Sequence, residues 1–417
     1  MPQFIVHPSP PLSGTVKLSG AKNSILKLMA ATLLAKGVHV IKNVPHISDV
    51  GIMSQVLVAM GAKVTHIQDV LRIEIPSNIN PHAPYHLVEQ MRASVVVLGP
   101  LLARYGQAEV SLPGGDDFGS RPIDMHLKGL EALGAVFETS HGYILGTASN
   151  MVGAEIVLEY PSHTATDNLI MAAVLSKGTT TIDNAAREPE VVDLANFLSK
   201  MGAIIKGAGT STIQIQGVDE LQPSEHVVIP DRVEAATFLA SVGIAKGEIF
   251  IQDAQPSHMS MLLQKLKDMG MTISAGSDGL FVKVDKRLKA VDVATLPFPG
   301  IATDYKPFIV TMLALSDGIG IVTENLFAGR FRYVDELRRM GADIRTEGHH
   351  AVVRGVERLS GAPVRSFDIR AGAALVLAGL AAEGETIVAN AEHILRGYDS
   401  LDAKLASLGA DVYFEKN

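Results

Sequence analysis

The sequence predicts a two-domain α/β protein in which each domain is an inside-out barrel, with buried helices sheathed by sheets. Three observations predict this fold. A glycine motif recurs six times at nearly constant spacing, one type of helix is apolar on all sides, and a second type is apolar on one face only. The length of 417 residues exceeds the size at which a single core stops growing. We therefore expect six βαβαββ-type repeats, three to a domain.

The repeat is marked by an apolar residue and a glycine, followed by a small or apolar residue and a strand, as in MGAKV and LGADV. Successive glycines of this motif are 68 to 73 residues apart: Gly61, Gly134, Gly202, Gly270, Gly341 and Gly409. A second glycine precedes each of them by 23 to 28 residues: Gly37, Gly106, Gly178, Gly247, Gly318 and Gly384. Such regularity indicates one repeated supersecondary unit.

Each repeat is expected to contain a buried helix and then a surface helix. Segments such as SILKLMAATLLAKG and GAALVLAGLAAEG are apolar nearly all round, which is typical of a helix packed on every side. The second glycine is expected to end this helix as a C-cap, and a short alternating strand such as TTTIDNA follows. The surface helix has an apolar stripe, for example Leu194, Phe197, Leu198 and Met201. The glycine motif and further strands close the repeat.

The strand near residues 4–6 precedes the first buried helix and has no repeat of its own to complete. We expect it to join the sheets of the last three repeats. One domain would then comprise residues 1–21 and 230–417, and the other residues 22–229. The chain would cross between the domains near residues 15–20 and 228–231.

Composition and charge exclude several classes of function. The formal charge of -8 argues against a nucleic-acid-binding surface, which needs basic residues to neutralise phosphates. Without cysteine there is no disulfide, thiolate zinc site or thiol nucleophile. The amino-terminal segment does not read as a signal peptide, and the longest apolar runs are about half a membrane span. We expect a cytoplasmic protein without membrane insertion, whereas the oligomeric state is not predicted.

No metal or cofactor is expected. The 14 histidines are scattered along the chain, and His349 and His350 fall in a predicted hairpin turn. Neither a P-loop nor a dinucleotide-binding fingerprint is present, and GAGTST at residues 207–212 is interpreted as a hairpin.

Charged residues and asparagines recur near the starts of both helices of the repeat. At the buried helix they are Lys22, Asn23, Arg92, Asp167, Asn168, Asp231, Arg232, Asp304, Asp368 and Arg370. At the surface helix they are Asp49, Arg121, Arg187, Glu188, Arg330 and Arg396. Helix capping explains Asp and Asn at such positions. A cation at a positive helix end is unfavourable without an anionic partner, so the pattern indicates a cationic cleft between the domains that binds a small polyanion. Separate surface salt bridges are the alternative.

A glycine-rich loop in the second repeat, SLPGGDDFGSRPID, is predicted to form a lid over residues 111–121. Glycines let a backbone approach a ligand closely, and lid closure excludes water. The loop contains the adjacent carboxylates Asp116 and Asp117, and their mutual repulsion would raise at least one pKa, which suits a general acid. Alternatively, the pair only forms an Asx turn.

The motifs around these charges resemble those of the UDP-N-acetylglucosamine enolpyruvyl transferases over essentially the whole chain. They are LSGAKNS, MRAS, SLPGG, GSRPID, NAAREPEVVD, PDRVEA, ATD, DIRA and HILRGYDS. The sister family of 5-enolpyruvylshikimate-3-phosphate synthases has a Gly-Asp-Lys-Ser type of motif where this chain has GAKN. The basic character and histidine context of the RNA 3′-terminal phosphate cyclases, which have a related repeat, are not evident here.

The resemblance implies transfer of the enolpyruvyl group of phosphoenolpyruvate to the 3′-hydroxyl of UDP-N-acetylglucosamine, with release of phosphate through a tetrahedral ketal. For phosphoenolpyruvate it implies Lys22, Asn23, Arg121, Arg330, Arg370 and Arg396. For the nucleotide sugar it implies Arg92, Arg121, Pro122, Ile123, Asp124, Met125, Ser162, His163, Thr164, Asp304 and Leu326. Asp304 would be the base for the 3′-hydroxyl, with Asp116, Lys22 and Arg396 as further catalytic residues.

The chain departs from the family pattern at three positions. Most members have cysteine in place of Asp116, and that cysteine serves as general acid and as the site that fosfomycin alkylates. The resemblance therefore implies an active enzyme that resists fosfomycin. Tyr160 and Ser48 each replace a lysine, which leaves the nucleotide-sugar contacts beside them open. The alternative function is a catalytically silent relative that binds a nucleotide sugar as a regulatory or scaffolding module.

Overall fold

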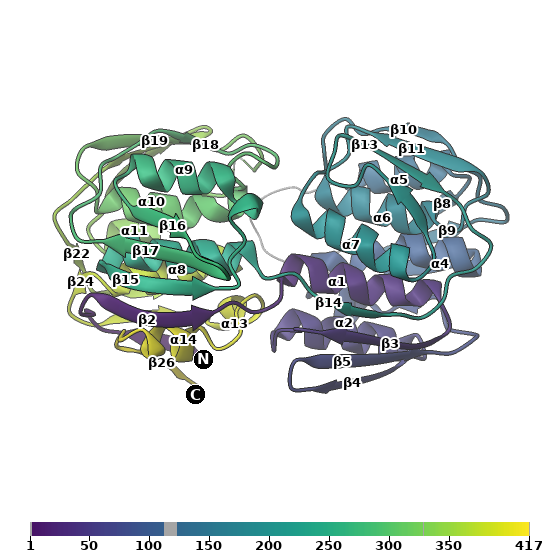
Figure 1. Cartoon of the computed structure of the whole chain (residues 1–417), viewed down its shortest axis with the longest axis horizontal. Coiled ribbons are helices and arrows are strands. Elements are labelled where there is room, and N and C mark those ends of the chain that lie inside the picture. Colours follow the sequence, from purple (N-terminus) through teal and green to yellow (C-terminus); the bar gives the residue numbers. More distant parts are fainter. Residues whose placement is uncertain (1, 112–122, 328, 417) are drawn as a thin grey trace. The chain divides into compact units, whose positions relative to one another are not determined.

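The computed structural model describes residues 2–111, 123–327 and 329–416. These residues form two compact domains. The N-terminal domain contains residues 20–111 and 123–229, and the C-terminal domain contains residues 2–19 and 230–416, residue 328 excepted. In each domain, helices pack against the inner faces of several sheets (Figure 1).

The strands of the N-terminal domain are β3 (Gly37–Lys42), β4 (Lys63–Ile67), β5 (Val70–Ile75), β6 (His82–Ala83), β7 (Gln107–Ser111), β8 (Val136–Ser140), β9 (Tyr143–Thr147), β10 (Glu155–Val157), β11 (Thr179–Asp183), β12 (Ile204–Lys206), β13 (Thr212–Gln216) and β14 (Glu225–Val227). They form three sheets, in the orders β14-β3-β5-β4, β6-β7-β9-β8 and β10-β11-β13-β12. In each sheet the first two strands are parallel and the other neighbours are antiparallel.

The C-terminal domain repeats this design. Its strands are β1 (Gln3–Val6), β2 (Leu12–Lys17), β15 (Gly247–Gln252), β16 (Thr272–Ala275), β17 (Gly279–Val284), β18 (Val293–Ala294), β19 (Ile319–Thr323), β20 (Asp343–Glu347), β21 (His350–Arg354), β22 (Leu359–Ser360), β23 (Pro363–Arg365), β24 (Ala382–Glu383), β25 (Thr386–Ala389) and β26 (Val412–Glu415). The four-stranded sheets have the orders β2-β15-β17-β16, β18-β19-β21-β20 and β23-β25-β1-β26, and β22 pairs with β24.

Three strands pair far from their neighbours in the sequence. β1 lies between β25 and β26 and completes the last sheet. β2 precedes the first helix of the N-terminal domain but pairs with β15, whereas β14 precedes the first helix of the C-terminal domain but pairs with β3. Each domain therefore takes one edge strand from the segment that leads into the other domain, and the chain crosses between them twice.

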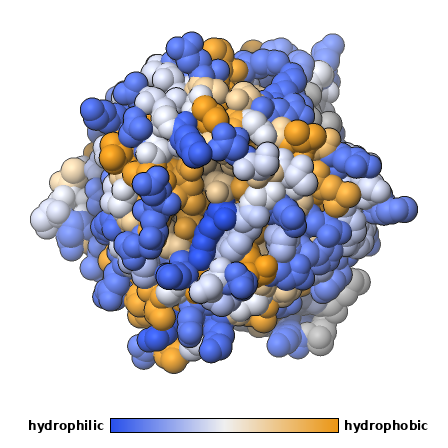
Figure 2. Space-filling view, turned by 90° about the vertical axis from the view of Figure 1, so that its right-hand side faces the viewer, coloured by the Kyte–Doolittle hydropathy of each residue, from blue (hydrophilic) through white to orange (hydrophobic). Residues whose placement is uncertain are grey.

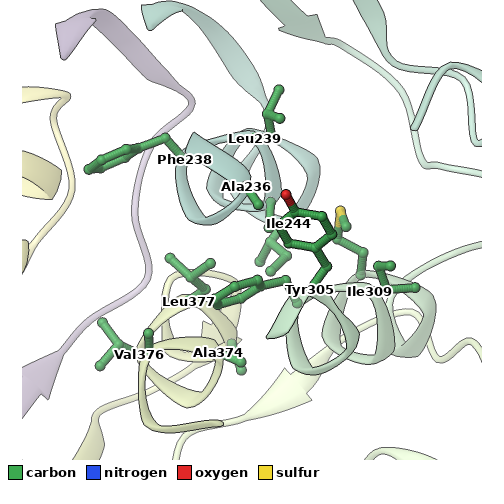
Figure 3. Close-up of a cluster of buried hydrophobic side chains, with 14 of the residues drawn as sticks. Ala236, Phe238, Leu239, Ile244, Tyr305, Ile309, Ala374, Val376 and Leu377 are labelled. Atoms are coloured by element: carbon green, nitrogen blue, oxygen red, sulfur yellow. The ribbon is translucent and has the colours of Figure 1, made fainter. Parts of the chain in front are cut away.

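The long inner helices are α1 (Lys22–Ala31), α4 (Leu98–Tyr105), α6 (His163–Ala173), α8 (Arg232–Ala245), α10 (Lys306–Ala314) and α12 (Ile369–Gly379). The 3-10 turns η1 (Thr32–Leu34), η2 (Arg92–Val97) and η4 (Thr303–Tyr305) extend three of them. Most of their residues are buried, as the apolar sequences predict. In the C-terminal domain, Ala236 of α8, Tyr305 before α10 and Leu377 of α12 lie between these three helices (Figure 3).

The outer helices are α2 (Ser48–Ala59), α5 (Asp124–Ala132), α7 (Pro189–Lys200), α9 (Ser260–Asp268), α11 (Val334–Arg339) and α14 (Leu401–Ser407). Each ends in the same way. After α2, the amide of Ala62 donates to the carbonyl of Leu57 at 3.0 Å, and the amide of Gly61 donates to that of Val58 at 2.9 Å. This is the Schellman motif, which places a residue of positive φ after the helix, and Gly61 has a φ of 106°. The recurring glycine motif is thus the stop signal of the outer helix. The shorter helices are α3 (Tyr85–Val88), α13 (Glu392–Leu395) and η3 (Pro256–His258).

The second set of glycines mostly does not cap the inner helices, contrary to the prediction. Gly106 does, with a φ of 68° after α4. Gly37 and Gly247, however, are the first residues of β3 and β15. A Cβ atom on Gly247 would lie 2.0 Å from the carbonyl oxygen of Leu12, so this glycine permits the close pairing of β15 with β2.

On the face drawn in Figure 2, apolar side chains form several separate groups among polar ones. Within the described residues, no helix combines the length and hydropathy that crossing a membrane requires.

Candidate active site

Asp304 lies between two buried arginines in the C-terminal domain. It belongs to η4, directly before α10, and 27% of its side chain is exposed. Nη1 of Arg330 donates to Oδ1 of Asp304 at 2.8 Å, and Nε of Arg370 donates to Oδ2 at 3.3 Å. The structure therefore brings together three residues that the sequence singled out, two from the fifth repeat and one from the sixth. It also fixes the orientation of the Asp304 carboxylate while leaving it accessible to solvent.

Asp368 extends this cluster from the start of α12. As the N-cap, its Oδ1 accepts two backbone amides of the first turn, and it lies 3.7 Å from Nη2 of Arg330. Burial opposes the charge of Arg330, but Asp304 and Asp368 outweigh this effect and raise the pKa of Arg330. Burial also opposes the charge of Arg370, and Tyr398 and Asp304 outweigh it, so the pKa of Arg370 is raised. Both guanidinium groups stay charged and have the geometry for bidentate binding of a carboxylate or phosphate.

A buried ion pair supports this cluster. Nζ of Lys306 lies 2.8 Å from Oε2 of Glu324 and donates to the carbonyl oxygen of Arg330 at 2.5 Å. Burial lowers the pKa of Lys306 to about 8, although Glu324 opposes this change. Oε1 of Glu324 accepts the amide of Leu326 at 2.8 Å. The pair thus holds the loop that carries Leu326 and Arg330.

Two other predicted positions in this domain are explained by capping and packing. Oδ1 of Asp231 accepts the amides of Val233 and Glu234 at 2.7 and 3.1 Å, as the N-cap of α8. Arg232 is buried, and its Nη1 donates to the Tyr305 hydroxyl at 3.0 Å. Capping therefore explains Asp231, whereas Arg232 is a core residue that contacts Tyr305. Arg396 directly follows α13 and is partly buried.

In the N-terminal domain, Lys22 has a carboxylate partner within the protein. Lys22 is the first residue of α1, and its Nζ lies 3.0 Å from Oδ2 of Asp49, in the first turn of α2. Asp49 is fully buried and Lys22 is 12% exposed. Asn23 follows Lys22 and is partly exposed. The cation at this helix start is therefore stabilised by Asp49, which is itself favourably placed at a helix amino terminus.

Asp167 and Asn168 do not lie at the start of their helix, so that prediction was wrong. α6 begins at His163, and Oγ of the N-cap Ser162 accepts the amide of Ala165 at 3.4 Å. The segment SHTATDN contains several residue types that cap helices, and the earlier serine caps this one. Asp167 consequently lies in the second turn and is fully buried, with its Oδ2 3.6 Å from Nζ of Lys27 on α1.

His126 connects α5 with α6 beside the predicted nucleotide-sugar residue Thr164. From α5, its Nε2 lies 3.2 Å from Oγ1 of Thr164, and its Nδ1 lies 3.0 Å from Nδ2 of Asn168. Because Oδ1 of Asn168 accepts the amide of Gly99, Nδ2 donates to Nδ1 of His126, and the imidazole carries its proton on Nε2. Burial, with Arg92 adding to the effect, lowers the pKa of His126 to about 3. The ring is therefore neutral.

The remaining predicted residues of this domain lie at three helix starts. Arg92 begins η2, and Ser162, His163 and Thr164 form the start of α6. Ile123 directly precedes α5, which begins with Asp124 and Met125. Asp116, Asp117, Arg121 and Pro122 lie outside the described residues, as does the predicted lid beyond Ser111. No group of three or more metal-ligating side chains is arranged to hold a metal ion among the residues that are described.

The sequence analysis missed the buried partners of these residues. Lys27 lies between apolar residues of α1, and Lys306 is the one charged residue of α10. A lysine within such an apolar run was the available signal. Glu324 and His126 carried no comparable signal, because each lies among residues of mixed polarity.

Comparisons with known proteins agree with this fold. The family model described as EPSP synthase (3-phosphoshikimate 1-carboxyvinyltransferase) matches residues 6–405. The UDP-N-acetylglucosamine 1-carboxyvinyltransferase of Corynebacterium jeikeium is 50% identical over 409 residues, which cover 98% of each chain. The enzyme of that name from Mycobacterium leprae is 51% identical over 410 residues, again 98% of each chain.

Solved structures confirm the predicted fold class. The enolpyruvyl transferase NikO from Streptomyces tendae superposes with a TM-score of 0.89 at 25% identity, covering 100% of this chain and 99% of its own. An EPSP synthase from Acinetobacter baumannii superposes with a TM-score of 0.79 at 17% identity, covering 100% of both chains, which bears on the fold alone. The chain therefore belongs to the EPSP synthase (3-phosphoshikimate 1-carboxyvinyltransferase) family of enzymes, and the relatives that it matches over full length are UDP-N-acetylglucosamine 1-carboxyvinyltransferases.

Proposed function

We propose that the protein transfers the enolpyruvyl group of phosphoenolpyruvate to the 3′-hydroxyl of UDP-N-acetylglucosamine, which is the first committed step of peptidoglycan biosynthesis. The observation that carries this proposal is the identity of about half of all positions, over 98% of the chain, with enzymes of that name. The paired guanidiniums around Asp304 support it, because phosphoenolpyruvate is a small anion with two acidic groups.

The proposed reaction has two steps. The sugar 3′-oxygen bonds to C2 of phosphoenolpyruvate while C3 takes up a proton, which forms a tetrahedral ketal. C3 then loses a proton as the bond between C2 and the phosphate oxygen breaks, and phosphate leaves. Asp304 accepts the hydroxyl proton in this scheme, and its two hydrogen bonds to arginines fix the direction of its carboxylate.

The charged residues take separate roles in this proposal. Lys22, Arg121 and Arg396 hold the phosphate, while Arg330 and Arg370 face the carboxylate of phosphoenolpyruvate. Their positive charges stabilise the negative charge of the ketal. Asn23 lies beside Lys22 in the phosphoenolpyruvate site, and for the nucleotide sugar the proposal assigns Arg92, residues 121–125 and 162–164, Asp304 and Leu326. The neutral His126 supports this last group, because it contacts Thr164 and lies next to Met125 in the sequence.

A phosphate-release assay tests the function. We expect phosphate only when both phosphoenolpyruvate and UDP-N-acetylglucosamine are present, and none when shikimate 3-phosphate replaces the nucleotide sugar. Release with shikimate 3-phosphate alone as acceptor would reassign the substrate. Binding of the nucleotide sugar without any turnover would instead favour a regulatory or scaffolding module.

Asp116 is proposed as the acid that protonates C3, and this role predicts the response to fosfomycin. A carboxylate is a much weaker nucleophile than a thiolate towards an alkylating epoxide, so the wild-type enzyme should retain its activity after incubation with the drug. The substitution Asp116→Cys should create a protein that fosfomycin inactivates in a time-dependent manner. The activity that remains after incubation with fosfomycin is measured for the wild type and for Asp116→Cys. Rapid inactivation of the wild type would contradict the proposal.

A further inference from the structure

A buried lysine and a buried aspartate face each other in the N-terminal domain. Lys27 of α1 is 4% exposed and Asp167 of α6 is completely buried, with Nζ and Oδ2 3.6 Å apart. Nζ of Lys27 also donates to the carbonyl oxygen of Asn23, one turn earlier on α1. The pair therefore joins the two helices and also contacts the backbone of the first turn of α1.

Further charged groups from a third helix surround Asp167. Glu190 lies in the first turn of α7 and is 2% exposed, and Glu188 precedes this helix. Both oppose the ionisation of Asp167, while Lys27 favours it. On α6 itself, Nε2 of His163 lies 3.4 Å from Oδ2 of Asp167. From α5, the neutral His126 contacts the neighbouring Asn168. Burial lowers the pKa of Lys27 and Lys22 adds to this effect, whereas Asp167 and Glu190 oppose it.

This arrangement is a poor device for stability alone. Both charges are removed from water, and the 3.6 Å between Nζ of Lys27 and Oδ2 of Asp167 is longer than a normal hydrogen bond. Breaking or burying such pairs is costly, and apolar residues of similar volume often serve stability equally well or better. The location of the pair offers a different reason for its presence.

Lys27 follows Lys22 and Asn23 by about one turn on α1, and Asp167 follows His163 by one turn on α6. The first pair of residues belongs to the proposed phosphoenolpyruvate site, and His163 lies in the proposed nucleotide-sugar segment 162–164. We propose that Lys27 and Asp167 are positioning residues that hold the first turns of α1 and α6 in one fixed arrangement, so that both substrate subsites are set together. This inference rests on the proposed function and adds to it a link between the two subsites.

The link depends on pH. Burial, together with Glu188 and Glu190, raises the pKa of Asp167 to about 7, with Lys27 acting in the opposite direction. Above this pH the carboxylate is ionised and attracts Lys27. Below it the carboxyl group is neutral, the attraction is lost, and the two turns are held less firmly.

Steady-state kinetics with Asp167→Asn between pH 5.5 and 8.5 test the inference. We expect the KM values for both substrates to rise together by about fivefold at pH 8, with kcat within about twofold, because neither residue touches reacting atoms. At pH 5.5 the KM values of variant and wild type should converge, since the wild-type carboxyl is then neutral. Comparing variant with wild type at each pH cancels the ionisation of the substrates themselves.

Three further variants sharpen the result. Lys27→Met should reproduce the joint rise in both KM values. It provides a second test of the link if Asp167→Asn does not fold. Asp167→Glu keeps the charge and should restore the pH dependence. Glu234→Gln removes an equally buried carboxylate from its 2.5 Å pair with Lys404 in the C-terminal domain, and it should lower stability while both KM values stay unchanged. Unchanged KM values in Asp167→Asn and Lys27→Met, or a pH-independent loss confined to kcat, would overturn the inference.

Failure of the proposed function is distinguishable. If the wild type transfers no enolpyruvyl group, the proposed function is wrong. The link between the first turns of α1 and α6 is then tested by hydrogen exchange at the amides of Ser24 and Thr166. These amides donate to Ala21 and Ser162 in the first turns of α1 and α6. At pH 8, Asp167→Asn should accelerate the exchange of both amides relative to the wild type, and at pH 5.5 it should accelerate neither. If the ratio of the variant's exchange rate to that of the wild type were the same at the two pH values, the link would be refuted.

Discussion

Buried arginines define the chemistry of the C-terminal domain at the level of single residues. Arg330 and Arg370 are almost fully buried, yet both stay charged. Asp304 and Asp368 lie beside Arg330, and against the effect of burial, Tyr398 and Asp304 raise the pKa of Arg370. A lysine in either place would carry the charge but could not form the same planar fork. The geometry of the guanidinium is thus as important as its charge.

Substitution of Arg370 by lysine tests this requirement. We expect Arg370→Lys to lower kcat/KM for phosphoenolpyruvate by about 100-fold, roughly 2.7 kcal/mol of transition-state stabilisation, because the donor to Oδ2 of Asp304 is lost. Steady-state kinetics measure the effect. Arg365→Lys, at an exposed arginine of β23, is the matched control and should leave kcat/KM unchanged. Similar values for both variants would contradict a role for the fork.

His126 makes the stability of the fold depend on pH. Its folded-state pKa of about 3 is far below the usual value of 6.5, so the unfolded chain binds a proton that the folded protein does not. The stabilisation is present above pH 6.5 and is lost progressively as the pH falls towards 3. Between pH 6.5 and 4.5 the loss amounts to about 2–3 kcal/mol for this one group.

The substitution His126→Gln isolates this contribution, because an amide can still donate and accept hydrogen bonds but does not titrate. We expect the free energy of unfolding of the variant to fall less steeply than that of the wild type between pH 6.5 and 4.5. Denaturant titrations at several pH values provide the measurement. Parallel curves for the two proteins would show that the imidazole is not held neutral.

At the level of elements, the glycine motif acts through the backbone rather than through packing. Gly61 ends α2 with a φ of 106°, and a Cβ atom there would meet no neighbouring atom within 4 Å. The conformation of this residue, and not the space around it, therefore requires glycine.

Two alanine substitutions in the same helix separate these effects. Gly61→Ala should destabilise the protein by about 1–2 kcal/mol, because an L-residue is strained at this positive φ. Gly51→Ala lies inside α2 at an exposed site without positive φ or close neighbours, and it should stabilise by about 0.5–1 kcal/mol. Denaturant midpoints measure both changes. If the two substitutions shifted stability in the same direction, the Schellman explanation would be contradicted.

On the scale of the whole molecule, the two ends of the chain complete the same sheet. Phe4 of β1 is fully buried and faces Val388 on one side and Phe414 on the other. The last sheet of the C-terminal domain therefore forms only when residue 4 has met residues 388 and 414, from the far end of the sequence.

Truncation of this side chain should act on one domain. Phe4→Ala should cost about 3–5 kcal/mol and accelerate hydrogen exchange in β25 and β26, while β3 and β5 keep their protection. Leu71→Ala, at a buried position of β5, should show the opposite pattern. Mass spectrometry of exchanging peptides can follow both variants. Equal acceleration in both domains after either change would mean that the domains unfold as one.

The sequence by itself determined the repeated architecture and most of the helix types. These features are local, because a helix that is apolar all round has to be buried and the φ after an outer helix requires glycine at one position. The charged residues at helix starts were also visible, and Asp304, Arg330 and Arg370 indeed lie together. Their proposed roles in substrate binding remain predictions.

Only the tertiary structure decided which distant groups meet. Asp167 was misplaced by one turn, and its contact with Lys27, like the contact of Lys306 with Glu324, joins elements far apart in the sequence. The pairing of β2 with β15 and of β14 with β3 is equally non-local. The physical reason is the same in each case. A buried charge or an open sheet edge must be satisfied by whatever group the folded chain brings near it, and local sequence patterns do not specify that partner.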